Sequence, residues 1–217
     1  MAQSTGTEMQ SVLKKFGFGI DVLEGPVTRN QIIAKIEEMI SKARKGDRLI
    51  LYFSTHGFDD KIIKSRGYIA TYDCQMSEPS VNCIELSYLE NLVQRAIQKP
   101  VKHLLILLDS CSSGLGVITK SPDYTEIPIA MQNGSHMITA GMADQQAQMD
   151  SHLQMSTFTY FVTKGLTGEA DYTKDKVISL TELLLYVRYN VATQSQGSQT
   201  PMIGRISGPG EMIFDLR

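Results

Sequence analysis

A chain of 217 residues, 42% hydrophobic and 20% charged, is long enough to bury one sizeable core, so we expect a single domain over residues 1–217. The formal net charge of −2 provides no strong basic field, which excludes nucleic acid as an expected partner. The first residues lack the basic and apolar regions of a signal peptide, and no apolar run approaches the roughly 20 residues that span a bilayer. No membrane partner is therefore expected.

The chain contains three cysteines, Cys74, Cys83 and Cys111. An odd number without close pairing does not fit a secreted disulfide framework and favours a reducing compartment, so we expect a cytoplasmic protein. Cys74 and Cys83 are expected to be small buried hydrophobic residues. Three of the histidines are expected to be surface or packing residues: His103, His136 and His152.

Helical spacing of apolar residues predicts a surface helix over 8–16 and a second helix over 28–40, which begins with a capping threonine. Residues 20–23, between them, are typical of a short strand. Two continuous apolar runs, 49–53 and 104–108, have the length and composition of strands covered on both faces. We expect both runs to lie inside a sheet.

The rest of the chain alternates between strand and helix patterns. This alternation predicts an α/β sandwich around a mostly parallel sheet, with helices on both faces. The further expected strands are 67–72, 137–140 and 212–216, and the further expected helices are 86–97, 157–166 and 180–192.

Small polar residues follow both apolar runs. His56 and Gly57 come after the first, and Cys111 comes after the second, three residues before Gly114. Because ligands bind beyond the carboxyl ends of strands in an open parallel sheet, we expect His56 and Cys111 to share one edge. A histidine beside a cysteine raises the thiolate fraction and can protonate a leaving amine, and the glycines allow backbone N–H groups to approach an oxyanion.

Three other kinds of site do not fit this sequence: a cysteine phosphatase, a serine hydrolase and a phosphate-binding loop. A cysteine phosphatase needs an arginine six places after its cysteine, where this chain has Val117. The Gly-x-Ser-x-Gly turn of a serine hydrolase does not occur around Ser110 or Ser112, and a phosphate-binding Gly-rich loop is also absent from the sequence. The cysteine and histidine pair therefore remains the leading candidate.

Leu51-Tyr-Phe-Ser-Thr-His-Gly57 is similar to the histidine motif of the caspase and metacaspase families of cysteine peptidases. Leu107-Leu-Asp-Ser-Cys-Ser-Ser-Gly114 resembles the Asp-x-Cys-x-Ser-Gly motif of the metacaspases. The separation of the two candidate residues, 111 − 56 = 55, is near the roughly 50 residues of caspases. Weaker likeness extends over most of the chain, through residues 68–73, 137–144, 156–159 and 178–183.

The resemblance implies a caspase-like three-layer sandwich and a cysteine endopeptidase. Its catalytic dyad would be His56 and Cys111, with an oxyanion hole formed by the backbone N–H groups of Gly57 and Cys111. Asp109 and Ser54 resemble the substrate-binding residues of metacaspases, which cleave after Arg or Lys, because a buried carboxylate would pair with either cation. Asp109 is alternatively a helix N-cap for the turn that starts at Cys111, and the two roles are compatible.

The chain departs from the family in two respects. The family's fold begins with an apolar strand and a loop carrying a further acidic pocket residue, whereas this chain starts at the helix that follows them. We therefore expect an N-terminally short domain, for which three explanations are open: a truncated gene model, a fragment, or one subunit of a larger assembly in which a partner chain or another segment supplies the missing strand. Ser112 replaces the usual histidine, a change expected to be tolerated. The alternative function is a catalytically inactive caspase-fold module that regulates or binds another protein.

Two weaker signals concern activation. Residues 171–182 carry oxygen-bearing side chains at five positions of an EF-hand-like loop, but Lys176 occupies the sixth place, where a glycine is needed. An ordinary helix-entry loop is the favoured interpretation, so no resident metal or cofactor is expected and calcium is considered only as an activator. In the long loop 115–135, cleavage after Lys120 is a hypothesis, and a mobile active-site loop is the alternative.

Overall fold

The computed structural model describes residues 2–60, 63, 66–97, 101–110, 131–142, 145, 149–150 and 155–217. A four-stranded sheet in the order β1-β5-β6-β10 forms the central layer, with β1 and β6 parallel to β5 and β10 antiparallel to β6. Its strands are β1 (Arg48–Ser54), β5 (His103–Asp109), β6 (Gly134–Thr139) and β10 (Met202–Ser207). β10 is the one strand of this sheet that the sequence analysis did not anticipate.

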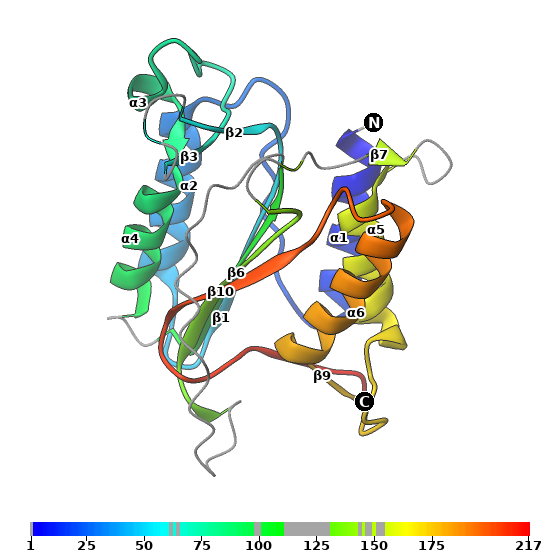
Figure 1. Ribbon diagram of the computed structural model, residues 1–217. Helices are drawn as coiled ribbons and strands as arrows, with labels where there is room; N and C mark the ends of the chain where they lie inside the picture. The colour runs from blue at the N-terminus through cyan, green and yellow to red at the C-terminus, as the bar shows by residue number, and fades with distance from the viewer. Residues whose placement is uncertain are drawn as a thin grey trace.

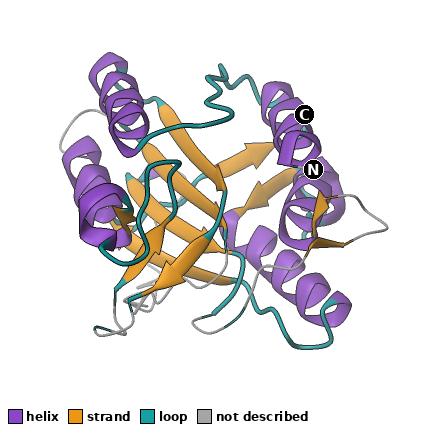
Figure 2. Ribbon diagram, turned by 90° about the horizontal axis from the view of Figure 1, so that it is seen from above, coloured by secondary structure: helices purple, strands orange, loops and turns teal. Residues whose placement is uncertain are grey.

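Helices cover both faces of the sheet (Figure 1). Helices α2 (Arg29–Lys42) and α4 (Leu86–Ile97) lie on one face. The opposite face carries α1 (Ala2–Lys15), α5 (Thr157–Lys164) and α6 (Leu180–Gln194). The view from above shows strands running between two groups of helices (Figure 2). This arrangement confirms the predicted α/β three-layer sandwich with a mostly parallel sheet.

Two apolar cores, separated by the sheet, hold the layers together. Side chains alternate across a strand, so Leu105 and Leu107 of β5 join the core under α1, α5 and α6. Leu104, Ile106 and Leu108 join the core under α2 and α4. β5 therefore contributes to both cores, and all seven of its residues are buried.

The two apolar runs do not occupy equivalent places. β5 lies between β1 and β6, as predicted for a strand inside the sheet. Among the described strands β1 pairs only with β5, and its apolar side chains are half-buried, so the prediction that residues 49–53 lie inside the sheet is wrong for this part of the chain. The partner segment expected beside this run stays a prediction.

Both predicted N-terminal helices form, although α1 begins six residues earlier than the predicted 8–16, and the strand expected between them does not form. Thr28 caps α2, with a reciprocal capping box to Gln31. Residues 20–23 form no strand, because no described strand pairs with them. Val22 and Leu23 are 47% and 46% exposed, which shows that this segment buries too little apolar surface to behave as a sheet strand.

Short elements complete the fold. An antiparallel sheet combines β2 (Gly57–Asp59), β3 (Gly67–Ile69) and β4 (Ile84–Glu85). A second small sheet pairs β9 (Val177–Ser179) with β11 (Ile213–Asp215). The strands predicted over 67–72 and 212–216 therefore form in shortened versions outside the central sheet. The other short elements are α3 (Pro79–Asn82), the pair β7 (Met149–Asp150) and β8 (Met155–Ser156), and a π-helical turn, Gly165–Glu169, after α5.

None of the described helices combines the length and apolar character that crossing a bilayer requires.

Candidate active site

The candidate site is built where β1 and β5 end side by side. Their parallel register runs from Arg48 opposite His103 to Ser54 opposite Asp109. Beyond this last pair, the backbone N–H of Thr55 donates to the carbonyl oxygen of Asp109 at 3.3 Å. The chain leaving β1 is thus fixed to the end of β5, and His56 comes two residues after the paired Ser54.

His56 is exposed, and its backbone is held by the neighbouring strand segment. The N–H of Ala70 donates to the carbonyl oxygen of His56 at 2.8 Å. The hydroxyl of Thr55 donates to the carbonyl oxygen of Ala70 at 3.0 Å. Gly57 then opens β2, opposite Ile69. These contacts fix the main chain on both sides of the imidazole and leave the ring accessible.

Cys111 lies outside the described residues, as do Ser112, Gly114, Lys120 and His152. The described chain stops one residue before Cys111, at a buried Ser110 that follows β5. The offset from the register pair is therefore the same for both candidate residues: His56 follows Ser54 by two places and Cys111 follows Asp109 by two places. The dyad itself stays a prediction, and so does cleavage after Lys120.

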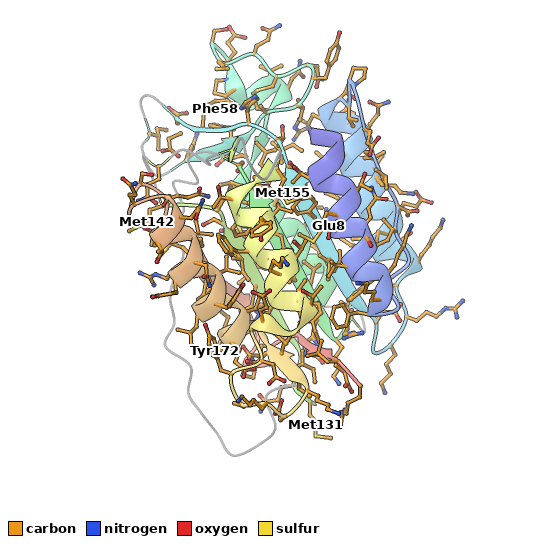
Figure 3. All side chains as sticks on the ribbon, turned by 90° about the vertical axis from the view of Figure 1, so that its right-hand side faces the viewer. Glu8, Phe58, Met131, Met142, Met155 and Tyr172 are labelled. Carbon is orange, nitrogen blue, oxygen red and sulfur yellow. A yellow bond between two sulfur atoms is a disulfide. The ribbon has the colours of Figure 1, made fainter. Side chains whose placement is uncertain are left out.

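Figure 3 places the labelled residues along the length of the molecule. Phe58 of β2 lies near the top of this view, Met142 and Met155 lie at about mid-height, and Met131, which precedes β6, lies at the bottom. Ser54 is exposed, as a substrate-contacting residue must be.

Asp109 is buried, only 5% exposed, and three hydroxyl groups surround its carboxylate. Ser156 donates to Oδ1 at 2.7 Å, and Thr159 donates to Oδ2 at 2.6 Å. The hydroxyl of Tyr52 lies 3.4 Å from Oδ2 and 2.7 Å from the Thr159 hydroxyl. Because Thr159 has one hydroxyl proton and gives it to Asp109, Tyr52 donates mainly to the Thr159 oxygen and shares its one proton only weakly with the more distant Oδ2 of Asp109.

The electrostatics of this carboxylate follow from its surroundings. Burial raises the pKa of Asp109 above its usual value, and the hydroxyl donors from Thr159, Ser156 and Tyr52 partly offset that rise. None of the ion pairs among the described residues includes Asp109. Oδ1 accepts a single described bond, which leaves acceptor capacity for one more donor. The proposed N-cap role concerns a turn outside the described residues and stays a prediction.

A family model described as the caspase domain matches residues 6–208, which is most of the chain. The chain belongs to the caspase-domain family. Two solved structures resemble the domain in fold: protein GSU0716 from Geobacter sulfurreducens, with a TM-score of 0.61, 16% identity and coverage of 93% of this chain and 82% of that one, and caspase-1 from Spodoptera frugiperda, with a TM-score of 0.58, 18% identity and coverage of 93% and 77%. No curated protein sequence matches the chain.

Several residues at this end of the caspase domain were not singled out individually from the sequence. Tyr52, Ser156 and Thr159 bind the carboxylate of Asp109. The side-chain oxygen of Gln145 accepts the N–H groups of Met142, at 3.0 Å, and of Thr200, at 2.7 Å, and so joins the chain after β6 to the chain before β10. The family-like segment 156–159 was a signal for two of these residues, whereas nothing in the local pattern marked Gln145.

The histidines of the caspase domain outside the site behave as packing residues where they are described. His103 is 2% exposed, and its Nε2 lies 2.9 Å from the carbonyl oxygen of Gln132. His136 is 5% exposed, and burial, together with the charge of Arg205, lowers its pKa to about 4. The burial of both side chains confirms the expectation that they are packing residues.

The loop 171–182 of the caspase domain forms a helix entry. The carboxylate of Asp171 accepts the N–H groups of Asp175 and Lys176 at 3.2 and 3.0 Å. Glu182 completes a capping box with Ser179 at the start of α6. Lys176 has a φ of 65°, the left-handed conformation for which an EF-hand loop uses glycine. These contacts support the helix-entry interpretation, and no group of ligands that could hold a metal occurs among the described residues.

Cys74 and Cys83 require a correction. They form a disulfide across a separation of nine residues, rather than acting as two independent buried hydrophobic residues. The sequence did not indicate this disulfide, because three cysteines cannot all pair and because the turn between Cys74 and Cys83, which includes α3, was not predicted. Cys83 is 2% exposed, so its expected burial is confirmed. The cytoplasmic location stays a prediction that the cysteine pattern no longer supports.

Proposed function

We propose that this caspase domain is a cysteine endopeptidase with Cys111 as nucleophile and His56 as its acid/base partner. The register of β1 and β5 is the observation that carries the proposal. With Ser54 opposite Asp109 and Thr55 bonded to Asp109, the next residues of both strands leave the sheet at one edge. Membership of the caspase-domain family supports the same chemistry.

The proposed reaction has two steps. The Cys111 thiolate attacks the scissile carbonyl carbon, and the backbone N–H groups of Gly57 and Cys111 stabilise the oxyanion that forms. His56 protonates the leaving amine, and the C–N bond breaks to give a thioester. His56 then takes a proton from water, which hydrolyses the thioester and regenerates the thiol. The exposure of His56 is consistent with contact to a substrate.

The proposed specificity is cleavage after Arg or Lys, as in the metacaspase type. The supporting observation is a buried carboxylate, Asp109, which pairs with no described cation and retains acceptor capacity on Oδ1. A substrate guanidinium or ammonium would supply the missing positive charge and donate a charge-assisted hydrogen bond to the carboxylate. Ser54 is proposed to contact the same substrate side chain from the end of β1.

The test uses electrophilic ketone probes that carry Arg, Lys or Asp at the position before the reactive group. We expect labelling of the full chain by the Arg and Lys probes, at Cys111 by peptide mass spectrometry, and loss of labelling in Cys111→Ala and His56→Ala. His152→Ala is the matched control and should label normally. Absence of labelling in a folded chain would favour the non-catalytic module, and preferential labelling by the Asp probe would refute the specificity.

A further inference from the structure

The disulfide lies on the segment that borders His56. Cys74 follows β3 by five residues, and Cys83 immediately precedes β4. The bond closes a loop that contains α3 and whose residues 75–78 are exposed. Cys83 is buried, whereas Cys74 is only partly buried and is the more exposed of the two bonded cysteines.

Hydrogen bonds connect this loop to His56. The hydroxyl of Thr71 lies 2.6 Å from the carbonyl oxygen of Asn82 and 2.8 Å from Oδ1 of Asp73, so it joins the two ends of the loop at the disulfide. Asp73 Oδ1 also accepts the N–H of Arg29, at the start of α2, at 3.0 Å. One residue before Thr71, the N–H of Ala70 donates to the carbonyl oxygen of His56.

We propose that Cys74 and Cys83 form a reversible redox switch that controls the position of His56. In the oxidised form, the disulfide holds residues 70–73 against α2 and against the carbonyl oxygen of His56. In the reduced form, the loop 74–83 loses its covalent link and keeps its hydrogen bonds and the packing of the buried Cys83, and the main chain around His56 opens more often. The effect on peptide cleavage rests on the proposed function, whereas the effect on the loop does not.

The redox step is thiol–disulfide exchange with a dithiol. A thiolate of the dithiol attacks Sγ of Cys74, the less buried of the two cysteines, the Cys74–Cys83 bond breaks, and Cys83 leaves as a thiolate that takes up a proton. The second thiol of the dithiol attacks the mixed disulfide and releases Cys74 as a thiol. The dithiol is oxidised to a cyclic disulfide, and two protein thiols are formed.

The test uses the full chain carrying Cys111→Ala, so that Cys74 and Cys83 are the only thiols. The chain is equilibrated with oxidised glutathione or with dithiothreitol, and mass spectrometry after alkylation reports the bond. Hydrogen exchange is then measured at the amide of Ala70 and across β5. We expect exchange at Ala70 to be about tenfold faster in the reduced chain and unchanged in β5.

Matched variants separate the disulfide from other features of the loop. Cys74→Ser/Cys83→Ser should exchange like the reduced chain under both conditions, whereas Val81→Ser, an exposed position within the same loop, should keep the redox response. Three results would each overturn the switch: both cysteines alkylated after oxidation, a bond that dithiothreitol does not reduce in the folded chain, or equal exchange at Ala70 in both forms.

An activity measurement distinguishes failure of the switch from failure of the proposed function. With Cys111 intact and active sites counted by the Arg probe, kcat/KM for an Arg peptide should be about tenfold lower in the double serine variant than in the oxidised chain. Equal values would overturn the control of His56. A chain with no peptidase activity in either form would refute the proposed function, while the exchange measurement would still decide the redox switch.

Discussion

The hydroxyl groups around Asp109 lead to a sharp prediction for Thr159→Val. This substitution keeps the branched shape of the side chain, so it leaves the packing of α5 in place and removes only the hydroxyl. Asp109 loses its 2.6 Å donor, and the Tyr52 hydroxyl loses its partner at 2.7 Å. Ser156 and the distant contact to Tyr52 then remain as the only described donors to the carboxylate.

The expected magnitude follows from the kinds of bond removed. A hydrogen bond to a charged group contributes about 1.5–3 kcal/mol, and a neutral one contributes about 0.5–1.5 kcal/mol. Thr159→Val removes one of each, so we expect a loss of about 3 kcal/mol in the free energy of unfolding. Thr163→Val is the matched control. Its hydroxyl is buried on the same helix but donates only to the carbonyl oxygens of Thr159 and Tyr160, so the loss should be about 1 kcal/mol.

The pH dependence of the Thr159→Val deficit tests whether the Asp109 carboxylate causes it. Burial raises the pKa of Asp109, so ionisation destabilises the folded state as the pH rises through this value. Thr159 stabilises the ionised form, and its removal increases this penalty. The deficit of Thr159→Val should therefore be full at high pH and shrink as the pH falls through the pKa of Asp109, whereas the deficit of Thr163→Val should stay constant. Urea unfolding from pH 9 to pH 4 measures both.

Two outcomes would refute this account of Asp109. The first is a deficit for Thr159→Val no larger than that of Thr163→Val. The second is a deficit for Thr159→Val that does not change with pH.

Three further predictions follow. Asp109→Asn should lower the preference for Arg over Gln before the cleaved bond roughly 100-fold, measured as the ratio of kcat/KM values, because it removes the charge that a cation would pair with; an unchanged ratio would assign specificity elsewhere. In the unaltered chain the buried His136 imidazole should lower the free energy of unfolding by roughly 3 kcal/mol as the pH falls from 6.5 to about 4, because the unfolded chain takes up the proton first. His136→Gln should remove this part of the pH dependence. Urea unfolding at pH 7 and 4.5 tests this, and an unaltered slope would contradict it. Gly134→Ala should destabilise the fold by roughly 3 kcal/mol, because the added Cβ would lie 1.7 Å from the carbonyl oxygen of Gly210. Gly6→Ala, in α1 and with open space around it, should stabilise the fold by about 0.5–1 kcal/mol. Thermal unfolding that ranks the two variants the other way would be inconsistent with this packing.

Local sequence patterns predicted most of the α/β sandwich because the spacing of apolar residues shows directly which side chains are buried. The apolar run in β5 and the capping threonine of α2 each specify an element from neighbouring residues alone. β10 was missed because its pairing depends on β6, more than 60 residues earlier, and not on its own short pattern. Residues 20–23 show the converse, since a strand-like sequence remains unpaired where no described strand lies beside it.

In the candidate site, too, local patterns indicated some residues, whereas others depend on tertiary packing. His56 and Asp109 could be proposed as site residues because each comes soon after an apolar run, and the parallel register brings the ends of the two strands together. The hydroxyl groups around Asp109 come from β1, β8 and α5, and their convergence depends on tertiary packing. The disulfide likewise depends on a turn that brings Cys74 and Cys83 together, which their spacing alone does not specify.

The double role of β5 has a consequence for unfolding. β5 contributes side chains to both apolar cores, so removing the helices from one face uncovers one side of a strand whose other side the second core needs in place. Separate melting of the two helical layers is therefore disfavoured, and calorimetry should record one cooperative transition, with equal calorimetric and van't Hoff enthalpies. Damage to a helix far from His56 would then abolish function by unfolding the whole molecule, without first distorting the site.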